Sequence, residues 1–140
     1  MQEIVPIIDI FAGPGGLGEG FSQLKDDKLK FKIALSVEMN EHAHQTLELR
    51  AFYRQFDKSP KAYFDYLNGA IDREALFAAH PVQANAAQTE AWYHEITEEG
   101  IQDVIDRAQQ ALKKFRSKEC VMIGGPPCQA YSTAGRSRMK

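Results

Sequence analysis

A cluster of four glycines near the start of the chain and a carboxylate further on could together bind a nucleoside. The apolar, β-branched run Ile4 to Ile10 stops at these glycines, which is typical of a buried strand entering a tight turn. Glu38 ends the next apolar run, where a carboxylate can accept hydrogen bonds from both hydroxyls of a ribose. We therefore predict a site for an adenosine-containing cofactor. The glycines are Gly13, Gly15, Gly16 and Gly18.

The glycine turn alone leaves the cofactor open. Gly13, Gly15 and Gly18 also fit the dinucleotide pattern G-x-G-x-x-G. A nicotinamide- or flavin-dependent enzyme is therefore the natural alternative at this point.

A second segment presents a thiol. Gly124-Gly125-Pro126-Pro127-Cys128 follows a predicted strand over Cys120 to Ile123. Prolines fix φ and glycines permit tight backbone, so the segment is expected to form a shaped loop at the carboxyl end of a strand, where open α/β sheets bind ligands. A structural cysteine would lie inside the strand, as we expect of Cys120. Cys128 is therefore the candidate nucleophile.

The spacing of apolar residues predicts alternating strands and helices. Strands are expected over 4–10, 31–37 and 120–123, a helix after the glycines, and another that Asn40 caps. Residues 101–115 give the strongest helical pattern of the chain. This order predicts an α/β fold, a partial doubly wound, Rossmann-like parallel sheet.

Residues 52–95 are predicted to form a helical insertion on one face of the sheet. Helices are expected over 61–67, 73–79 and 82–94, with Ser59 and Asp72 as N-caps, and the aromatic side chains of the segment are expected to pack. The aromatic residues are Tyr63, Phe64, Trp92 and Tyr93.

Composition excludes several classes of protein. The chain of 140 residues is 44% hydrophobic with a net charge of −2, as in ordinary globular proteins. Two cysteines and scattered histidines predict no metal site, and no apolar run is long enough for a membrane span, so a cytoplasmic protein is expected. Residues 113–140 carry a net charge of +6, which suggests either a polyanion contact or a solvated helix end and tail.

Two motifs resemble those of one family, the DNA (cytosine-5) methyltransferases. Residues 9–16, Asp-Ile-Phe-Ala-Gly-Pro-Gly-Gly, are similar to the family's cofactor motif. Residues 125–132, Gly-Pro-Pro-Cys-Gln-Ala-Tyr-Ser, are similar to its catalytic motif. The resemblance extends over the whole chain and is weakest across 52–95. His94-Glu95-Ile96 stands where the family has Gly-Asp-Ile.

The resemblance implies S-adenosylmethionine as cofactor and Cys128 as the catalytic thiolate. Phe11 would stack on the adenine, residues 13–16 would face the methionine part and Glu38 would hold the ribose. The full set of implied cofactor contacts is Phe11, Ala12, Gly13, Gly15, Gly16, Leu17, Glu38, Met39, Ile96 and Pro127. The implied DNA contacts are Gln129, Ser132, Arg136 and Arg138.

The implied reaction is methyl transfer to C5 of a cytosine that is flipped out of double-stranded DNA. The thiolate would add to C6 and make C5 nucleophilic. A non-catalytic cofactor-binding module and a nicotinamide-dependent oxidoreductase remain the alternatives.

The family's later Glu-Asn-Val motif and its target-recognition region do not occur in residues 1–140. We therefore expect the N-terminal part of the catalytic domain of a longer enzyme. Because the first motif begins at Asp9, we expect a bacterial restriction-modification enzyme, located in the cytoplasm at the nucleoid. The chain alone is expected to be inactive, and its exposed sheet edge is expected to favour self-association.

Overall fold

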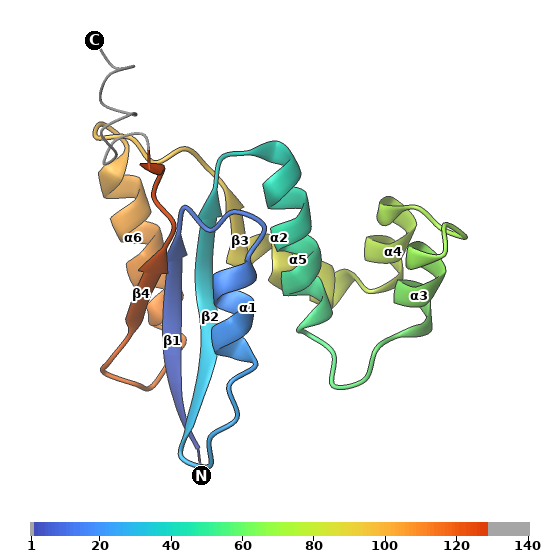
Figure 1. Ribbon diagram of the computed structural model, residues 1–140, viewed down its shortest axis with the longest axis horizontal. Helices are drawn as coiled ribbons and strands as arrows, with labels where there is room; N and C mark the ends of the chain where they lie inside the picture. Colours follow the sequence, from blue (N-terminus) through green and yellow to red (C-terminus); the bar gives the residue numbers. More distant parts are fainter. Residues whose placement is uncertain (1, 129–140) are drawn as a thin grey trace.

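The computed structural model describes residues 2–128 and contains one parallel sheet of four strands (Figure 1). The strands are β1 (Glu3–Ile10), β2 (Leu29–Glu38), β3 (Ala91–Tyr93) and β4 (Val121–Gly124), in the spatial order β3-β2-β1-β4. All three strand pairs are parallel. The predicted α/β, Rossmann-like fold is confirmed.

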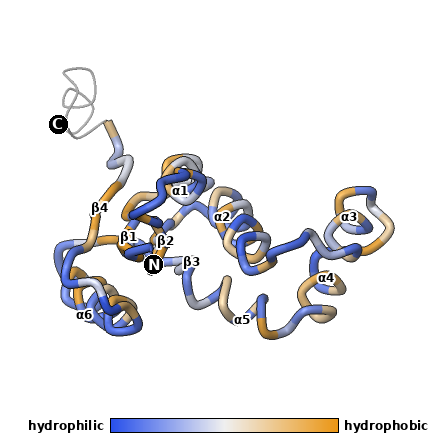
Figure 2. Tube along the Cα trace, turned by 90° about the horizontal axis from the view of Figure 1, so that it is seen from below, coloured by the Kyte–Doolittle hydropathy of each residue, from blue (hydrophilic) through white to orange (hydrophobic). Residues whose placement is uncertain are grey.

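Within residues 2–128, six helices connect the strands: α1 (Gly16–Ser22), α2 (Glu41–Tyr53), α3 (Lys61–Leu67), α4 (Arg73–Ala79), α5 (Pro81–Glu90) and α6 (Ile101–Leu112). In Figure 2, α1 and α2 lie on one side of the sheet and α6 on the other. Because every strand is parallel, each crossover returns the chain to the same end of the sheet. We call this starting end the amino edge and the opposite end the carboxyl edge.

Two clusters of buried apolar residues lie within residues 2–128. Ile8, Leu35 and Val37 of the central strands pack against the apolar side of α6. The other cluster joins α2, α4, α5 and β3 around Phe52, which is fully buried and stacks on Phe77 with ring centroids 4.8 Å apart. The sheet is thus covered at its centre on both faces, as near-continuous apolar strands require.

Most predicted elements form, and their caps explain where they begin. Asn40 accepts a hydrogen bond from Ala43 N–H at the start of α2, and Asp72 accepts one from Ala75 N–H at the start of α4, both as predicted. The expectation for Ser59 was wrong, because Pro60 holds the N-cap position of α3 without a side-chain hydrogen bond.

The segment 52–95 departs from the expectation in two ways. Figure 1 shows α3 and α4 extending away from the sheet instead of lying on its face. The helix expected over 82–94 ends at Glu90, and Ala91–Tyr93 forms β3 beside β2. Trp92 packs as expected, stacked on His94 with Arg107 over its ring, whereas Phe64 and Tyr93 are exposed. Tyr63 packs against the core around Phe52.

The last strand begins and ends one residue later than expected. Cys120 was predicted inside it, but β4 begins at Val121 and Cys120 is exposed. The cause is the position of β4 at the end of the sheet, where within residues 2–128 it pairs with β1 alone and Met122 stays 66% exposed. No described helix is long and apolar enough to span a bilayer.

Candidate functional site

The carboxyl edge of the sheet brings together the glycine turn, Glu38 and the cysteine segment. β1, β2 and β4 are neighbours, and each ends at this edge: β1 at Ile10, β2 at Glu38 and β4 at Gly124. Residues that the sequence separates by more than a hundred positions therefore meet at one place. This juxtaposition was expected from the parallel topology.

The glycine turn begins with a residue in an unusual backbone conformation. Phe11 has φ 53°, in the left-handed region that non-glycine residues rarely adopt. This conformation turns the chain sharply out of β1, and Ala12 N–H then donates to the Val37 carbonyl at 3.0 Å. Backbone strain of this kind persists where surrounding contacts fix it, often at functional sites.

Gly13 and Gly15 complete the turn with φ 59° and 89°. A side chain at Gly15 is disfavoured for two reasons. The positive φ strains any residue other than glycine, and a Cβ would lie 2.8 Å from Leu47 Cδ1 of α2. At Gly13 and Gly16 a Cβ would meet no atom within 4 Å. The outer side of the turn is therefore open and can accept a ligand against bare backbone.

Glu38 holds the turn through its carboxylate. Its Oε2 accepts a hydrogen bond from Gly13 N–H at 2.7 Å, and its Oε1 accepts one from Asn40 N–H at 2.7 Å. A carboxylate has about four lone-pair positions, so each oxygen keeps one for a further donor. The side chain is half-buried. The same group can therefore shape the turn and accept two hydroxyl groups of a ligand.

The cysteine segment lies directly beside the turn. Gly125 N–H donates to the Phe11 carbonyl at 3.4 Å, which joins the two motifs by their backbones. Gly124 is required at this contact, because a Cβ there would overlap the Ile10 carbonyl oxygen. Pro127 and Cys128 follow and are exposed. The thiol is thus exposed three residues beyond the contact with the proposed cofactor turn.

The remaining predicted cofactor residues are placed around this edge. Ala12 is half-buried against the core formed by α2, α4 and α5, and Leu17 and Met39 are about half exposed. Ile96 follows β3 and lines a hollow of about 320 Å³ with Thr97, Glu98 and Ile101. His94 N–H donates to the Glu38 carbonyl at 3.1 Å, so the segment 94–96 starts beside Glu38. The predicted DNA contacts Gln129, Ser132, Arg136 and Arg138 lie outside the described residues.

Asp9 belongs to the site but received no role from the sequence. It is 1% exposed at the end of β1, opposite Ser36 of β2, and neither carboxylate oxygen has a hydrogen-bond partner among the described residues. Burial raises the pKa of Asp9 to about 6, partly opposed by Arg54 and slightly reinforced by Glu38. An acid inside an otherwise apolar strand was the signal that could have indicated it.

Arg54 explains how acidic residues are tolerated beneath the turn. Its guanidinium pairs with Glu19 of α1 at 2.6 Å and with Glu90 of α5 at 2.5 Å, and all three side chains are largely buried. This network ties α1 and α5 to the end of α2. Burial raises the pKa of Glu90, while Arg54 opposes that shift. Residues 2–128 contain no cluster of three or more His, Cys, Asp or Glu side chains that could hold a metal ion.

Comparisons with known proteins identify two relatives. The chain is 34% identical to a type II methyltransferase of Bacillus paralicheniformis in an alignment 151 positions long, which covers 96% of this chain and 33% of the relative. It is 26% identical to a protein of Oceanobacillus iheyensis named as a candidate type II methyltransferase, over 99% of this chain and 21% of the relative. No family model and no solved structure matches the chain. The chain is thus similar over nearly its whole length to proteins named as type II methyltransferases, and spans about a third and a fifth of their lengths.

Proposed function

We propose that this chain is part of a DNA methyltransferase that binds S-adenosylmethionine at the carboxyl edge and uses Cys128 to methylate C5 of cytosine. The observation that carries the proposal is the hydrogen bond from Gly125 N–H to the Phe11 carbonyl, which sets the cysteine segment against the glycine turn. The similarity to type II methyltransferases supports methyl transfer over the nicotinamide alternative.

The residues of the edge fit S-adenosylmethionine. The open space in front of Gly13 and Gly16 admits a ligand against the backbone, and Glu38 keeps a free lone pair on each oxygen for a ribose hydroxyl. The exposed apolar side chains of Leu17 and Met39 are available to cover an adenine or a methionine chain. When bound, the cofactor supplies an electrophilic methyl group.

Cys128 makes cytosine reactive in the proposed mechanism. Its thiolate forms a bond to C6, the C5–C6 double bond opens, and C5 becomes nucleophilic enough to take the methyl group. Loss of the C5 proton to a base then restores the double bond and breaks the Sγ–C6 bond. The cytosine has to leave the duplex for this, because the thiolate attacks C6 perpendicular to the ring plane and both ring faces are stacked against neighbouring bases in the helix.

Calorimetric titration of the chain tests the cofactor assignment. We expect S-adenosylmethionine to bind and NAD not to bind, with S-adenosylhomocysteine as a positive control. Tighter binding of NAD would overturn the assignment in favour of an oxidoreductase.

The reaction is tested on a fusion in which this chain replaces the matching segment of the Bacillus paralicheniformis methyltransferase. We expect radiolabelled methyl groups to appear on C5 of cytosine after digestion of the DNA. Label on an exocyclic nitrogen of adenine or cytosine would refute the role of Cys128, because methylation at nitrogen needs no covalent adduct.

A further inference from the structure

Positive charges from two distant segments meet at the amino edge, far from Cys128. Residues 23–30 lead from α1 into the start of β2, and residues 113–120 connect α6 to β4, so parallel topology brings both to the end where the strands begin. Two hydrogen bonds join these amino-edge loops through the first residue of β1. Ser117 Oγ donates to Glu3 Oε1 at 3.3 Å, and Glu3 N–H donates to the Lys28 carbonyl at 2.8 Å.

The amino-edge loops and Glu3 carry seven positive and four negative charges, a net of +3 in a chain whose total is −2. The rest of the chain therefore sums to −5. All seven cations are exposed, and the four ion pairs found within residues 2–128 involve other residues. The seven are Lys25, Lys28, Lys30, Lys113, Lys114, Arg116 and Lys118.

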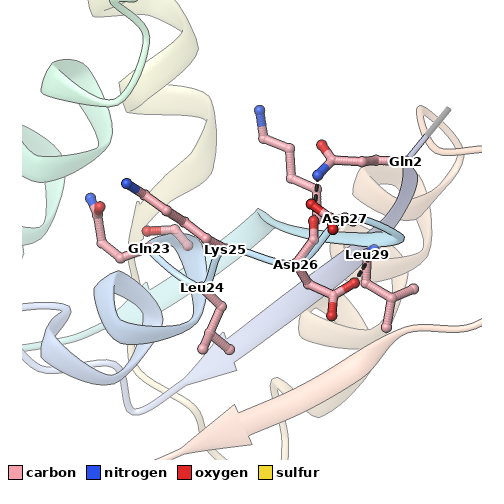
Figure 3. Close-up of a pocket in the computed structure, with 9 residues that line it drawn as sticks. Gln2, Gln23, Leu24, Lys25, Asp26, Asp27 and Leu29 are labelled. Atoms are coloured by element: carbon pink, nitrogen blue, oxygen red, sulfur yellow. Dashed lines mark hydrogen bonds between the residues drawn. The ribbon is translucent and has the colours of Figure 1, made fainter.

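The surface beside two of these cations is hollow. A depression of about 500 Å³ lies at the α1–β2 loop, where Lys25 and Lys30 line it together with Asp27 and two leucines. Figure 3 shows Lys25 on its wall. Asp26 also lines it, but its Oδ1 accepts hydrogen bonds from the N–H groups of Lys28 and Leu29. Part of the negative charge of the loop is thus already engaged by its own backbone.

We propose that the amino edge is a contact surface for the phosphate backbone of duplex DNA, separate from the reacting edge. Six of the seven cations are lysines, which are depleted at protein–protein interfaces but common on positively charged DNA-binding surfaces. Exposed large apolar side chains at this edge are limited to Ile4, Leu24 and Leu29 among the described residues. The composition therefore favours phosphates over an acidic protein.

The contact is distinct from the one that methylation requires. The eight residues of β1 separate the two edges by roughly 25 Å. A straight duplex that reaches Cys128 does not also reach the amino edge. The amino edge is therefore free to bind a second stretch of DNA, without regard to its sequence. The inference shares its DNA partner with the proposed function, but it requires neither the cofactor nor the thiol.

The test compares two variants that each remove three positive charges. One carries Lys28→Gln, Lys30→Gln and Lys118→Gln at the amino edge, and the other carries Arg136→Gln, Arg138→Gln and Lys140→Gln near the C-terminal end. Fluorescence anisotropy measures binding of a labelled 24-base-pair duplex to the 140-residue chain between about 50 and 200 mM KCl, a range over which binding through phosphates weakens strongly. Circular dichroism confirms that both variants fold.

We expect the amino-edge variant to bind DNA at least about tenfold more weakly at low salt. The slope of log K against log[KCl] should also become shallower by about 0.9 for each phosphate that the variant no longer neutralises, or close to three in all. Cofactor titration of the same variant should be unchanged. Failure of the unmodified chain to bind cofactor would count against the proposed function. It would not change the conclusion drawn from DNA binding, because the amino-edge contact requires no cofactor.

Two results would overturn the inference. The first is wild-type affinity and slope in the amino-edge variant, with the C-terminal variant accounting for all the salt dependence. The second is unchanged DNA binding together with abolished binding to poly-glutamate, which would identify an acidic protein as the partner.

Discussion

At the carboxyl edge of the sheet, the Glu38 carboxylate and backbone N–H groups hold one another in place, whereas at the amino edge lysines extend from two loops into solvent. Gly13 N–H, Asn40 N–H and Gly125 N–H all have partners there. The amino-edge cations have no ion-pair partner among residues 2–128. The first edge has fixed geometry suited to chemistry, and the second has exposed charge suited to binding without sequence preference.

The largest expected effect is on the chemistry of the carboxyl edge. Cys128→Ser in the fusion protein should lower methyl transfer by roughly a thousandfold or more, because an alcohol is far less ionised and less nucleophilic than a thiol near neutral pH. Scintillation counting of labelled DNA measures the decrease.

Cys120→Ser is the matched control, because Cys120 is also exposed but precedes β4 on the side of the amino-edge loops. It should transfer methyl groups at the wild-type rate. Near-normal methyl transfer by Cys128→Ser would instead show that Cys128 is not the nucleophile. The carboxyl edge would then have no catalytic thiol to distinguish it from the amino edge.

The second expected effect concerns the stability of the carboxyl edge. The pKa of Asp9 is raised from 3.8 to about 6 in the folded chain, so the folded state binds a proton more tightly than the unfolded state. The resulting stabilisation is fully present below the unfolded-state pKa and is lost as the pH rises through the folded-state pKa. A shift of about 2 units corresponds to roughly 3 kcal/mol.

Asp9→Asn removes this titration while keeping the shape of the side chain. Urea denaturation measures the free energy of unfolding at pH 5 and pH 7.5. In the wild-type chain it should decrease between the two pH values because Asp9 loses its proton, and in the variant this decrease should be absent. A wild-type chain with the same pH dependence as the variant would show that Asp9 has an ordinary pKa. Ser36→Ala is a useful companion, because Ser36 lies opposite Asp9 and its hydroxyl is also buried without a partner among the described residues.

The residues of the carboxyl edge could be predicted from the sequence because each of its three segments can be recognised locally. The turn at 13–16, Glu38 at the end of a strand and the segment ending at Cys128 each follow an apolar run, and each was placed correctly at a strand end. The role of Glu38 in holding the turn could not be predicted, because it depends on a hydrogen bond across 25 positions.

Other features could not be predicted because they depend on tertiary neighbours. Ala91–Tyr93 continues a helical apolar period, and pairing with β2 makes it a strand. Residues 113–118 belong to the predicted basic end at 113–140, but the β1–β4 pairing carries them to the edge opposite Cys128. The amino-edge surface likewise exists only because the fold joins segments about ninety positions apart.

The third prediction separates the two roles of Glu38. Glu38→Ala should weaken S-adenosylmethionine binding by about 1 to 3 kcal/mol, because the variant lacks both acceptor oxygens. It should also accelerate hydrogen exchange of the Gly13 and Asn40 amides in the absence of cofactor, because neither amide then has its acceptor. Nuclear magnetic resonance measures the exchange, and calorimetry measures the binding.

Glu38→Gln provides the control, because its amide keeps one acceptor oxygen and should protect one of these two amides. Weaker binding with unchanged exchange in Glu38→Ala would mean that Glu38 contacts the ligand but does not shape the turn. Unchanged binding would remove Glu38 from the site.

The smallest expected effects compare one side-chain cap at each edge. Asn40 caps α2 at the carboxyl edge through Ala43 N–H, and Asp26 accepts from Lys28 and Leu29 N–H at the amino edge. Asn40→Ala should lower the free energy of unfolding by about 1 kcal/mol, as is usual for an N-cap. Asp26→Ala should lower the free energy of unfolding by less, because this carboxylate is fully exposed and water competes for its hydrogen bonds.

The effect of Asp26 should also depend on pH. Its backbone hydrogen bonds hold its pKa below 3.8, so its contribution is present at neutral pH and is lost as the pH falls through the folded-state pKa. The difference in urea midpoint between wild type and Asp26→Ala should therefore shrink in acid, while that for Asn40→Ala persists. Equal decreases in stability at neutral pH would mean that the amino-edge loop is as rigidly built as the carboxyl edge. The contrast between a fixed reacting edge and an adaptable charged edge would then fail.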